Sequence, residues 1–254
     1  MELLCDGLKH PECTIAKLRV DVGILAELFS SHLAEVLRKN QRLRELDLSF
    51  RNPHEKTMEL LCEGLKHPEC TIAKLRLDVN ILTESCSRHL ADIFRKNQRL
   101  RELDLSLRNP DEKTMELLCD GLKHPACTVV KLRFDVDILT ELFSRHLAEV
   151  LRKNQRLKEL DLSLKNPDEK TMELLCDGLK HPECTIANLR FYGVMMNELF
   201  SSHLAEVLRK NQRLRELDLS FRNPHEKTME LLCEGLKHPE CTIAKLRYVF
   251  PLSF

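Results

Sequence analysis

Apolar residues recur along this chain in two alternating spacings. In residues 72–77 the order is apolar-x-x-apolar-x-apolar, and the last two members, Leu75 and Leu77, alternate with polar residues at the period of a strand. In residues 115–122 the apolar positions recur at helical spacing. The two patterns alternate with short links, which predicts strands and helices joined by right-handed crossovers into a parallel sheet. Nine strands are expected, from Ile15–Val20 to Ile243–Tyr248.

Both patterns belong to an internal repeat of 57 residues. The segment MELLCDGLKHPECTIAKLR begins at Met1, and near-copies begin at Met58, Met115, Met172 and Met229. Each copy has two halves of 28 or 29 residues, and each half supplies one strand and one helix. The expected fold is an α/β solenoid: an arc with the parallel sheet on its concave face and the helices on its convex face. We expect a single repeat domain over residues 1–254.

The helix of the second half has clear start and stop signals. In residues 109–112 we expect Asn109 to cap the helix, Pro110 to take its first position and Glu112 to close a capping box. Pro125 should end the helix. In the first half, a longer amphipathic stretch after Thr140 predicts a second helix.

The spacing L-x-x-L-x-L at a period of 28 or 29 is typical of leucine-rich repeats. The segments LLCEGLKHPEC (Leu60–Cys70) and LRELDLS (Leu43–Ser49) closely resemble the NLRP family, whose cytosolic innate-immune and reproductive proteins carry pyrin, NACHT and leucine-rich-repeat domains. Ribonuclease inhibitor shares the alternating repeat. The resemblance covers essentially the whole chain. It does not extend to the NACHT or pyrin domains, because the chain has no G-x-x-x-x-G-K-[ST] loop and no room for a pyrin domain.

The resemblance implies a cytoplasmic protein–protein interaction scaffold with the regulatory, ligand-sensing role of this domain in innate immunity and the inflammasome. One alternative is a stand-alone enzyme inhibitor of the ribonuclease-inhibitor type. Another is a repeat fragment without a selected partner, because Met1 falls inside a repeat and Tyr248–Phe254 leaves the pattern.

The sequence departs from the family at the turn after each strand. Family repeats usually place Asn or Cys three residues after the last strand Leu, and here Asn80 alone fits well. The consensus Leu two residues later is Pro in the second halves, so the Asn before each Pro is expected to satisfy the turn. These prolines are Pro53, Pro110, Pro167 and Pro224.

Composition narrows the class of partner. The 40 Lys and Arg residues balance 40 Asp and Glu residues, and the sequence pI is about 7.1. This balance argues against a nucleic-acid binder, which needs a basic surplus, and against a polybasic membrane anchor. Aromatic residues make up 5% of the chain and Trp is absent, which argues against a stacking platform for bases. We therefore expect protein partners.

Two rows of charged residues are expected to point into the arc, with signs that alternate from strand to strand. The first row is Arg19, Asp47, Arg76, Asp104, Arg133, Asp161, Arg190, Asp218 and Arg247. The second row is Lys17, Glu45, Lys74, Glu102, Lys131, Glu159, Asn188, Glu216 and Lys245. Either the rows are a self-neutralising ladder that sets the repeat register, or they form a partner-binding surface. We favour the ladder, and a site for strongly basic ribonucleases should show an acidic surplus instead.

An apolar row lies near the exit of the strands. Its residues either pack in the core, in place of the missing family Leu, or form an exposed stripe that binds a partner. We favour the core, and the solvent exposure of Phe50 and Phe221 decides between the two. The row comprises Val22, Phe50, Val79, Leu107, Val136, Leu164 and Phe221.

The recurring triplet Cys62, His67 and Cys70 raises the question of zinc. A tetrahedral site needs four ligands, so we favour buried structural cysteines and expect no metal, no cofactor and no disulfide. The chain is not expected to be an enzyme, because no nucleophile converges on the histidines that recur at one helix position. These are His32, His89, His146 and His203.

Overall fold

The computed structural model describes residues 2–108, 110–136, 139–164, 168–195, 197–222 and 226–249. The side chains of Leu164, Val194, Met195, Phe221 and Arg222 lie outside this description. The chain divides into two compact units, Met1–Val130 and Lys131–Phe254.

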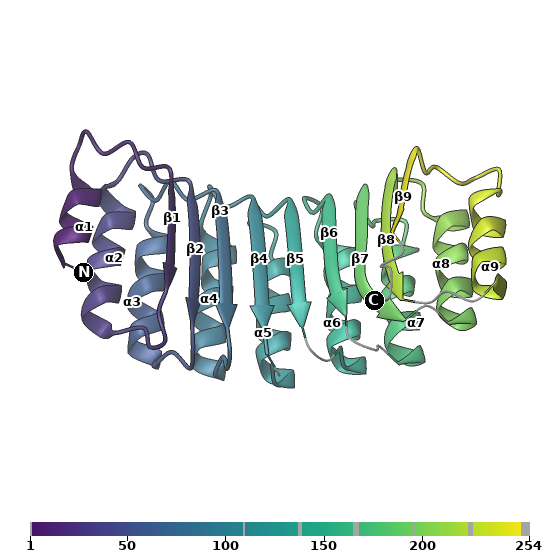
Figure 1. Cartoon of the computed structure of the whole chain (residues 1–254), viewed down its shortest axis with the longest axis horizontal. Coiled ribbons are helices and arrows are strands. Elements are labelled where there is room, and N and C mark those ends of the chain that lie inside the picture. Colours follow the sequence, from purple (N-terminus) through teal and green to yellow (C-terminus); the bar gives the residue numbers. More distant parts are fainter. Residues whose placement is uncertain are drawn as a thin grey trace. The chain divides into compact units, whose positions relative to one another are not determined.

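In the first unit four parallel strands follow one another in the order β1-β2-β3-β4. Figure 1 shows the helices of this unit covering one face of the strands and leaving the other face open. The helices are α1 Glu2–Lys9, α2 Glu27–Lys39, α3 Glu55–Lys66, α4 Glu84–Lys96 and α5 Glu112–Lys123. The strands are β1 Lys17–Asp21, β2 Glu45–Phe50, β3 Lys74–Val79 and β4 Glu102–Leu107.

The second unit repeats the arrangement with five parallel strands in the order β5-β6-β7-β8-β9. Its helices also cover one face of the strands (Figure 1). The strands are β5 Lys131–Val136, β6 Glu159–Leu164, β7 Asn188–Met195, β8 Glu216–Arg222 and β9 Lys245–Val249. The helices are α6 Glu141–Lys153, α7 Glu169–Leu179, α8 Glu198–Lys210 and α9 Glu226–Leu236.

The predicted α/β leucine-rich-repeat fold is confirmed, and one detail of the strand limits is wrong. The first strand begins at Lys17 rather than Ile15, and its counterpart β3 begins at Lys74. The preceding apolar residue of the motif, Ile72, is buried in the turn before the strand. The backbone bends there because the N–H groups of Ala73 and Lys74 both donate to one carbonyl, that of Arg44, at 2.8 and 3.0 Å.

The apolar row belongs to the hydrophobic core where its side chains are described. Phe50 is 3% exposed, and Val79, Leu107 and Val136 are equally buried. Val22 is partly exposed. The alternative of a partner-binding stripe is therefore wrong for the four buried residues, because they pack between sheet and helices as the strand alternation requires. The side chains of Leu164 and Phe221 lie outside the described residues.

Neighbouring helices approach closely at one glycine and one alanine per repeat. A Cβ added to Gly64 in α3 would lie 2.7 Å from the Cα of Ala34 in α2. The same contact joins Gly121 to Ala91, with 2.9 Å between the added Cβ and the Cα of Ala91. No side chain larger than hydrogen fits at these glycines unless the helices move apart. The glycines of the repeat therefore set the distance between helices.

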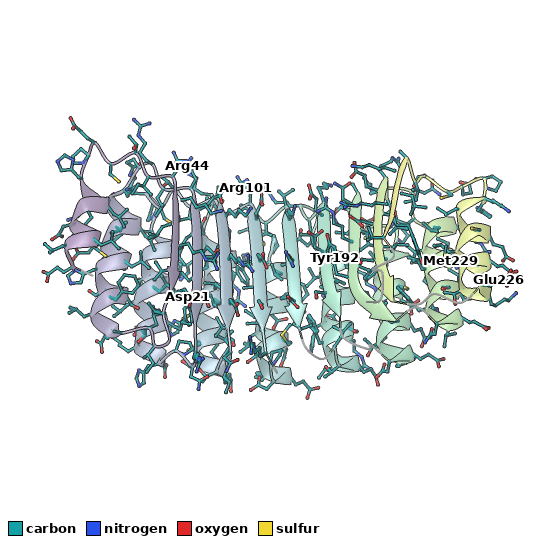
Figure 2. All side chains as sticks on the ribbon, viewed as in Figure 1. Asp21, Arg44, Arg101, Tyr192, Glu226 and Met229 are labelled. Carbon is teal, nitrogen blue, oxygen red and sulfur yellow. The ribbon has the colours of Figure 1, made fainter. Side chains whose placement is uncertain are left out.

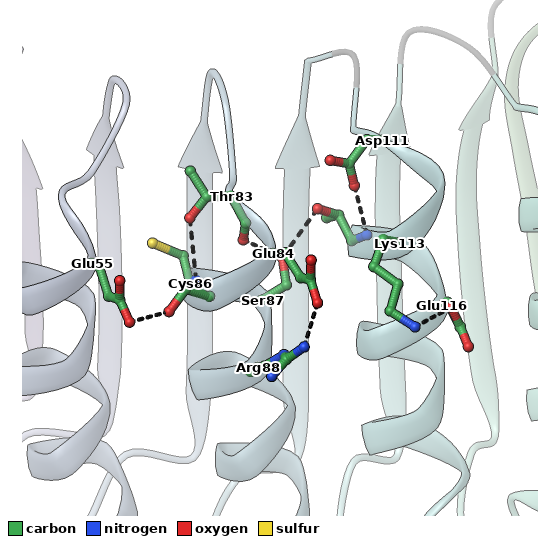
Figure 3. Close-up of polar contacts among 11 residues, drawn as sticks. Glu55, Thr83, Glu84, Cys86, Ser87, Arg88, Asp111, Lys113 and Glu116 are labelled. Atoms are coloured by element: carbon green, nitrogen blue, oxygen red, sulfur yellow. Dashed lines mark hydrogen bonds and ion pairs between the residues drawn. The ribbon is translucent and has the colours of Figure 1, made fainter.

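The helix start expected at Asn109 is wrong. Helix α5 begins at Glu112, and its N-cap is Asp111, whose carboxylate accepts the N–H of Thr114 at 2.7 Å (Figure 3). An Asp reaches this N–H as readily as an Asn, and its charge suits the positive helix end. Asn109 itself lies outside the described residues. The stop before Pro125 is confirmed, since α5 ends at Lys123.

Candidate functional site

The open face of the first unit carries the charged rows in the predicted register. Arg19, Asp47, Arg76 and Asp104 are direct cross-strand neighbours on β1 to β4. Asp47 lies between two cations, with its carboxylate 3.7 Å from Arg19 Nε and 4.0 Å from Arg76 Nε. Arg76 Nε is in turn 3.8 Å from Asp104. Each interior charge of this row therefore has opposite charges on both sides.

The second unit continues the alternation, with a more buried pair. Asp161 is 5% exposed, and Arg190 Nη1 lies 3.3 Å from its carboxylate and donates a hydrogen bond to it. Arg190 also lies 4.0 Å from Asp218, which is 3.9 Å from Arg247.

The second row is paired in the same way. Lys17 and Glu45 lie 3.3 Å apart, and the equivalent pairs Lys74–Glu102, Lys131–Glu159 and Lys245–Glu216 lie at 3.4, 3.2 and 3.2 Å. These pairs are exposed or partly exposed, so each is worth at most about 1 kcal/mol. Within each unit the two rows therefore match neighbouring strands by charge, except at Asn188 in the second row. A shift by one half-repeat would set like charges side by side.

A third row on the open face differs from the other two. In the first unit it reads Asp21, Ser49, Asp78 and Ser106 in register. The cross-strand neighbours of Asp78 are the two serines, and within the described part of the chain Asp78 forms no ion pair. In this third row, neighbouring strands are therefore not matched by opposite charges.

Strand β7 breaks the repeat on the open face. Asn188 stands where the other first-half strands have Lys, and Tyr192 stands where they have Asp or, in the last copy, Val249. Figure 2 labels Tyr192 on this strand, and the guanidinium of Arg133 lies 6.0 Å from the centre of its ring. Gly193 follows with φ of 73°, a left-handed conformation that favours glycine, and the register shifts at this bulge.

The helix-to-strand turns contain residues that the sequence reasoning missed. Asn97 ends helix α4, and its Oδ1 accepts the N–H groups of Arg99 and Leu100, both at 2.8 Å. Its Nδ2 donates to the carbonyl of Leu65 in the preceding half-repeat at 2.6 Å. Thr128 of the following half-repeat then donates to the carbonyl of Leu100 at 2.7 Å. Asn40 and Asn211 repeat the contacts of Asn97.

The missed signal was the recurrence of Asn at the end of every first-half helix. The family pattern places Asn after the strand, where Asn80 alone fits well. In the structure this bonding between half-repeats lies at the other end of the strand, at the Asn that follows each first-half helix.

The Cys–His triplet has local structural partners. Cys62 is fully buried in α3, and desolvation raises the pKa of its thiol far above the usual value. His67 follows the helix, and its Nδ1 accepts the N–H of Glu69 at 3.2 Å. Among the described residues, no group of three or more His, Cys, Asp and Glu side chains could hold a metal ion. All eleven cysteines are free thiols.

The recurring histidines His32, His89, His146 and His203 are partly exposed on the first-half helices. No helix in the described residues has the length and apolar character needed to cross a membrane.

The chain is similar to known proteins over nearly its full length. It is 37% identical to NACHT, LRR and PYD domains-containing protein 12 of Homo sapiens, over 97% of this chain and 23% of that protein. It is 32% identical to NACHT, LRR and PYD domains-containing protein 14 of Homo sapiens, over 96% of this chain and 22% of that protein. It is 33% identical to ribonuclease inhibitor of Mus musculus, over 96% of this chain and 54% of that protein.

No family model matches the chain. The chain spans about a quarter of the length of the NACHT, LRR and PYD relatives and about half of ribonuclease inhibitor. None of these relatives carries the name of an enzyme. Since both kinds of relative match the same repeats over almost the whole sequence, the chain is an NLRP-like leucine-rich-repeat domain of the ribonuclease-inhibitor-like type.

Proposed function

We propose that this domain is a protein-binding scaffold with the regulatory, ligand-sensing role that its resemblance to NLRP proteins implies, acting in the cytoplasm in innate-immune signalling. Residues 1–254 act as one repeat domain in this proposal. The similarity to NACHT, LRR and PYD proteins supports the role. The open sheet face of each unit supports protein binding, because such faces are the usual binding surfaces of solenoids.

We place the main contact on the open face of the second unit, around β7. The observation that carries this choice is the interruption of the second charged row at Asn188 and of the third row at Tyr192. The neighbours of Tyr192 in register are Ser163 and Ser220, so its ring is flanked by small side chains. Tyr and Arg are the residue types that dominate binding energy at protein interfaces. The paired charges around them exclude water rather than supply affinity.

The test is affinity capture with quantitative mass spectrometry on three forms of the chain. The variant Asn188→Lys with Tyr192→Asp restores the repeat residues, and Asp78→Asn is the control at the same row in the first unit. Proteins retained by the wild type and the control should be lost by the β7 variant, while all three forms unfold at the same denaturant concentration. Identical captures on all forms would contradict the placement at β7.

The second candidate, an enzyme inhibitor of the ribonuclease-inhibitor type, is favoured by the similarity to that protein. Its test is a ribonuclease inhibition assay on the same preparations. Stoichiometric inhibition would replace the scaffold proposal, because a signalling scaffold has no reason to block a ribonuclease.

A further inference from the structure

The helix-to-strand edge of each unit carries cations that differ from those of the open face. The turn Lys-Asn-Gln-Arg-Leu-Arg/Lys occurs twice in each unit, and all three cations of every copy are exposed. Figure 2 labels Arg44 and Arg101 at this edge of the first unit. The four copies are residues 39–44, 96–101, 153–158 and 210–215.

These cations are almost all unpaired, whereas the cations of the open face are matched by carboxylates. Within the described ranges, Lys96 alone among the twelve has a carboxylate at ion-pair distance, with Asp92 at 4.0 Å. Two of the arginines are held by carbonyl oxygens: Nη1 of Arg101 donates to the carbonyl of Gln98, and that of Arg215 to the carbonyl of Gln212, both at 3.1 Å. Most of these cations therefore face solvent without a described carboxylate at ion-pair distance.

The backbone that presents these cations is held rigidly. In the turns of Asn40, Asn97 and Asn211, the Asn side chain accepts two N–H groups and donates to a carbonyl of the preceding half-repeat. The main chain at Arg99 and Arg213 is therefore held in place by hydrogen bonds. A surface that is already ordered loses less entropy when it binds than a flexible one. The main chain that carries these cations is therefore pre-organised for a ligand.

The second unit adds a pocket to this edge. It has a volume of about 660 Å³ and lies between the turn after α7 and the turn after α8. Lys158, Lys210, Arg213 and Arg215 line it, and no described carboxylate does. Lys180 is also part of the wall, but it is neutralised by Asp177 at 2.8 Å and Glu206 at 2.9 Å. The pocket thus combines a concave shape with uncompensated positive charge.

We propose that this basic edge binds an acidic segment of a partner protein, and that the pocket of the second unit seats one of its carboxylate side chains. The inference rests on the proposed protein-binding function for the class of partner, and it uses a surface separate from β7. The acidic residues nearby do not cancel the charge, because each Cys-containing turn of the edge brings at most one Glu against three cations. These residues are Glu12, Glu69, Glu183 and Glu240.

Three observations favour a polypeptide over nucleic acid or an anionic membrane. The chain as a whole has no net charge, whereas nucleic-acid binders carry a basic surplus. The four Lys-Asn-Gln-Arg-Leu-Arg/Lys turns contain no aromatic side chain on which bases could stack. They also contain no exposed apolar residue that could enter a lipid surface. Finally, the two turns of a unit are two strands apart, about 10 Å, which matches about three residues of an extended peptide.

The chain offers a matched control at the opposite edge. Lys56, Lys113, Lys170 and Lys227 also recur once per repeat and are exposed, but each pairs with a Glu three residues later. Figure 3 shows the pair Lys113–Glu116, at 2.7 Å, beside the capped end of α5. Replacing four cations at either edge changes the net charge equally. A difference between the two variants therefore reports position and not total charge.

The experiment measures binding of a fluorescent poly-glutamate peptide to the full chain by anisotropy, at increasing salt. One variant replaces Arg42, Arg99, Arg156 and Arg213 by Gln, and the control replaces the four lysines by Gln. We expect the arginine variant to lose at least about tenfold in affinity and the control less than about twofold. Binding by the wild type should weaken as salt rises.

Parallel titrations with an oligothymidylate strand and with phosphatidylserine vesicles identify the occupant. Tighter binding of either one with the same dependence on the four arginines would overturn the acidic-segment proposal in favour of that class. Absence of peptide binding by the wild type, or equal losses in both variants, would also overturn it. Neither result changes what is expected from affinity capture with the Tyr192 variant. A wrong proposal for the edge can therefore be distinguished from a wrong proposal for the scaffold function.

Discussion

At the scale of single residues, burial decides what the repeated side chains can do. The sequence repeats Cys at two positions per copy, but it does not show that the Cys within the helix is buried away from solvent. Cys176 is fully buried, and desolvation raises the pKa of its thiol to about 12. The equivalent Cys233 in the last helix is exposed. One position of the repeat is therefore buried in α7 and exposed in α9, which predicts two different reactivities.

The prediction at this scale concerns thiol reactivity. An alkylating reagent at neutral pH should modify Cys233 in the folded chain and leave Cys176 unmodified, because only the thiolate reacts and burial keeps Cys176 protonated. Mass spectrometry of peptides after a short exposure measures both sites, and unfolding in urea should make them equally reactive. Equal modification of the folded chain would contradict the burial of α7.

Asparagine shows why part of the residue scale could not be predicted. The residues Asn40 and Asn97 were visible in the repeat, and Asn is a common residue at helix ends. Their bond to the preceding half-repeat depends on how far apart successive helices lie. That distance is a tertiary quantity, and no local pattern contains it.

At the scale of elements, helix type and order were predictable, because the apolar spacing distinguishes strand from helix in every half-repeat. Helix starts were less predictable. Asn and Asp are both good N-cap residues, and the choice between Asn109 and Asp111 depends on where the turn after the strand ends. The close approach of Gly121 to Ala91 was not predicted either. Glycine inside a helix costs about 1 kcal/mol relative to Ala, so its recurrence was the available signal.

Replacing this glycine tests the helix contact. Gly121→Ala should lower the free energy of unfolding by about 1–3 kcal/mol, because the new Cβ would lie 2.9 Å from backbone atoms of Ala91. The control is Gly7→Ala in α1, where an added Cβ meets nothing within 4 Å and helix propensity favours Ala. Urea unfolding measures both. A stabilising effect of Gly121→Ala would show that the helices are not held in contact.

The cap of α7 gives a prediction of pH dependence. Hydrogen bonds from Thr171 lower the pKa of Asp168 in the folded chain, so the carboxylate contributes stability above its unfolded pKa and loses it as pH falls through the folded value. Asp168→Asn keeps a capping oxygen without the charge. The free energy of unfolding of the wild type should exceed that of this variant by about 0.5 kcal/mol near pH 7, and the difference should be smaller near pH 3.

Urea unfolding of both proteins at the two pH values measures this difference. Glu169→Gln is the control, since Glu169 is exposed and accepts no hydrogen bond among the described residues. A difference that grows toward low pH would contradict the cap assignment.

At the scale of the whole molecule, charge balance has a spatial meaning. The sequence predicted the alternating rows correctly, because residues at the same repeat position on adjacent parallel strands are neighbours across the sheet. It did not predict the unpaired cations at the helix-to-strand edge, since pairing there depends on which turns face each other. The zero net charge of the chain therefore does not mean that every charge is paired: the open face carries matched charges, whereas most cations of the edge have no described carboxylate at ion-pair distance.

We infer that the alternating charges of the open face hold successive repeats in register, which leaves recognition to unpaired groups. The most direct test compares Asp47→Lys with Asp78→Lys by urea unfolding. Both change one Asp on the open face, but Asp47 lies between Arg19 and Arg76, whereas Asp78 lies between two serines.

Asp47→Lys should lower the free energy of unfolding by about 1–3 kcal/mol, because two attractions become repulsions. Asp78→Lys should change it by less than about 0.5 kcal/mol. Equal effects of the two substitutions, or no effect of Asp47→Lys, would contradict the claim.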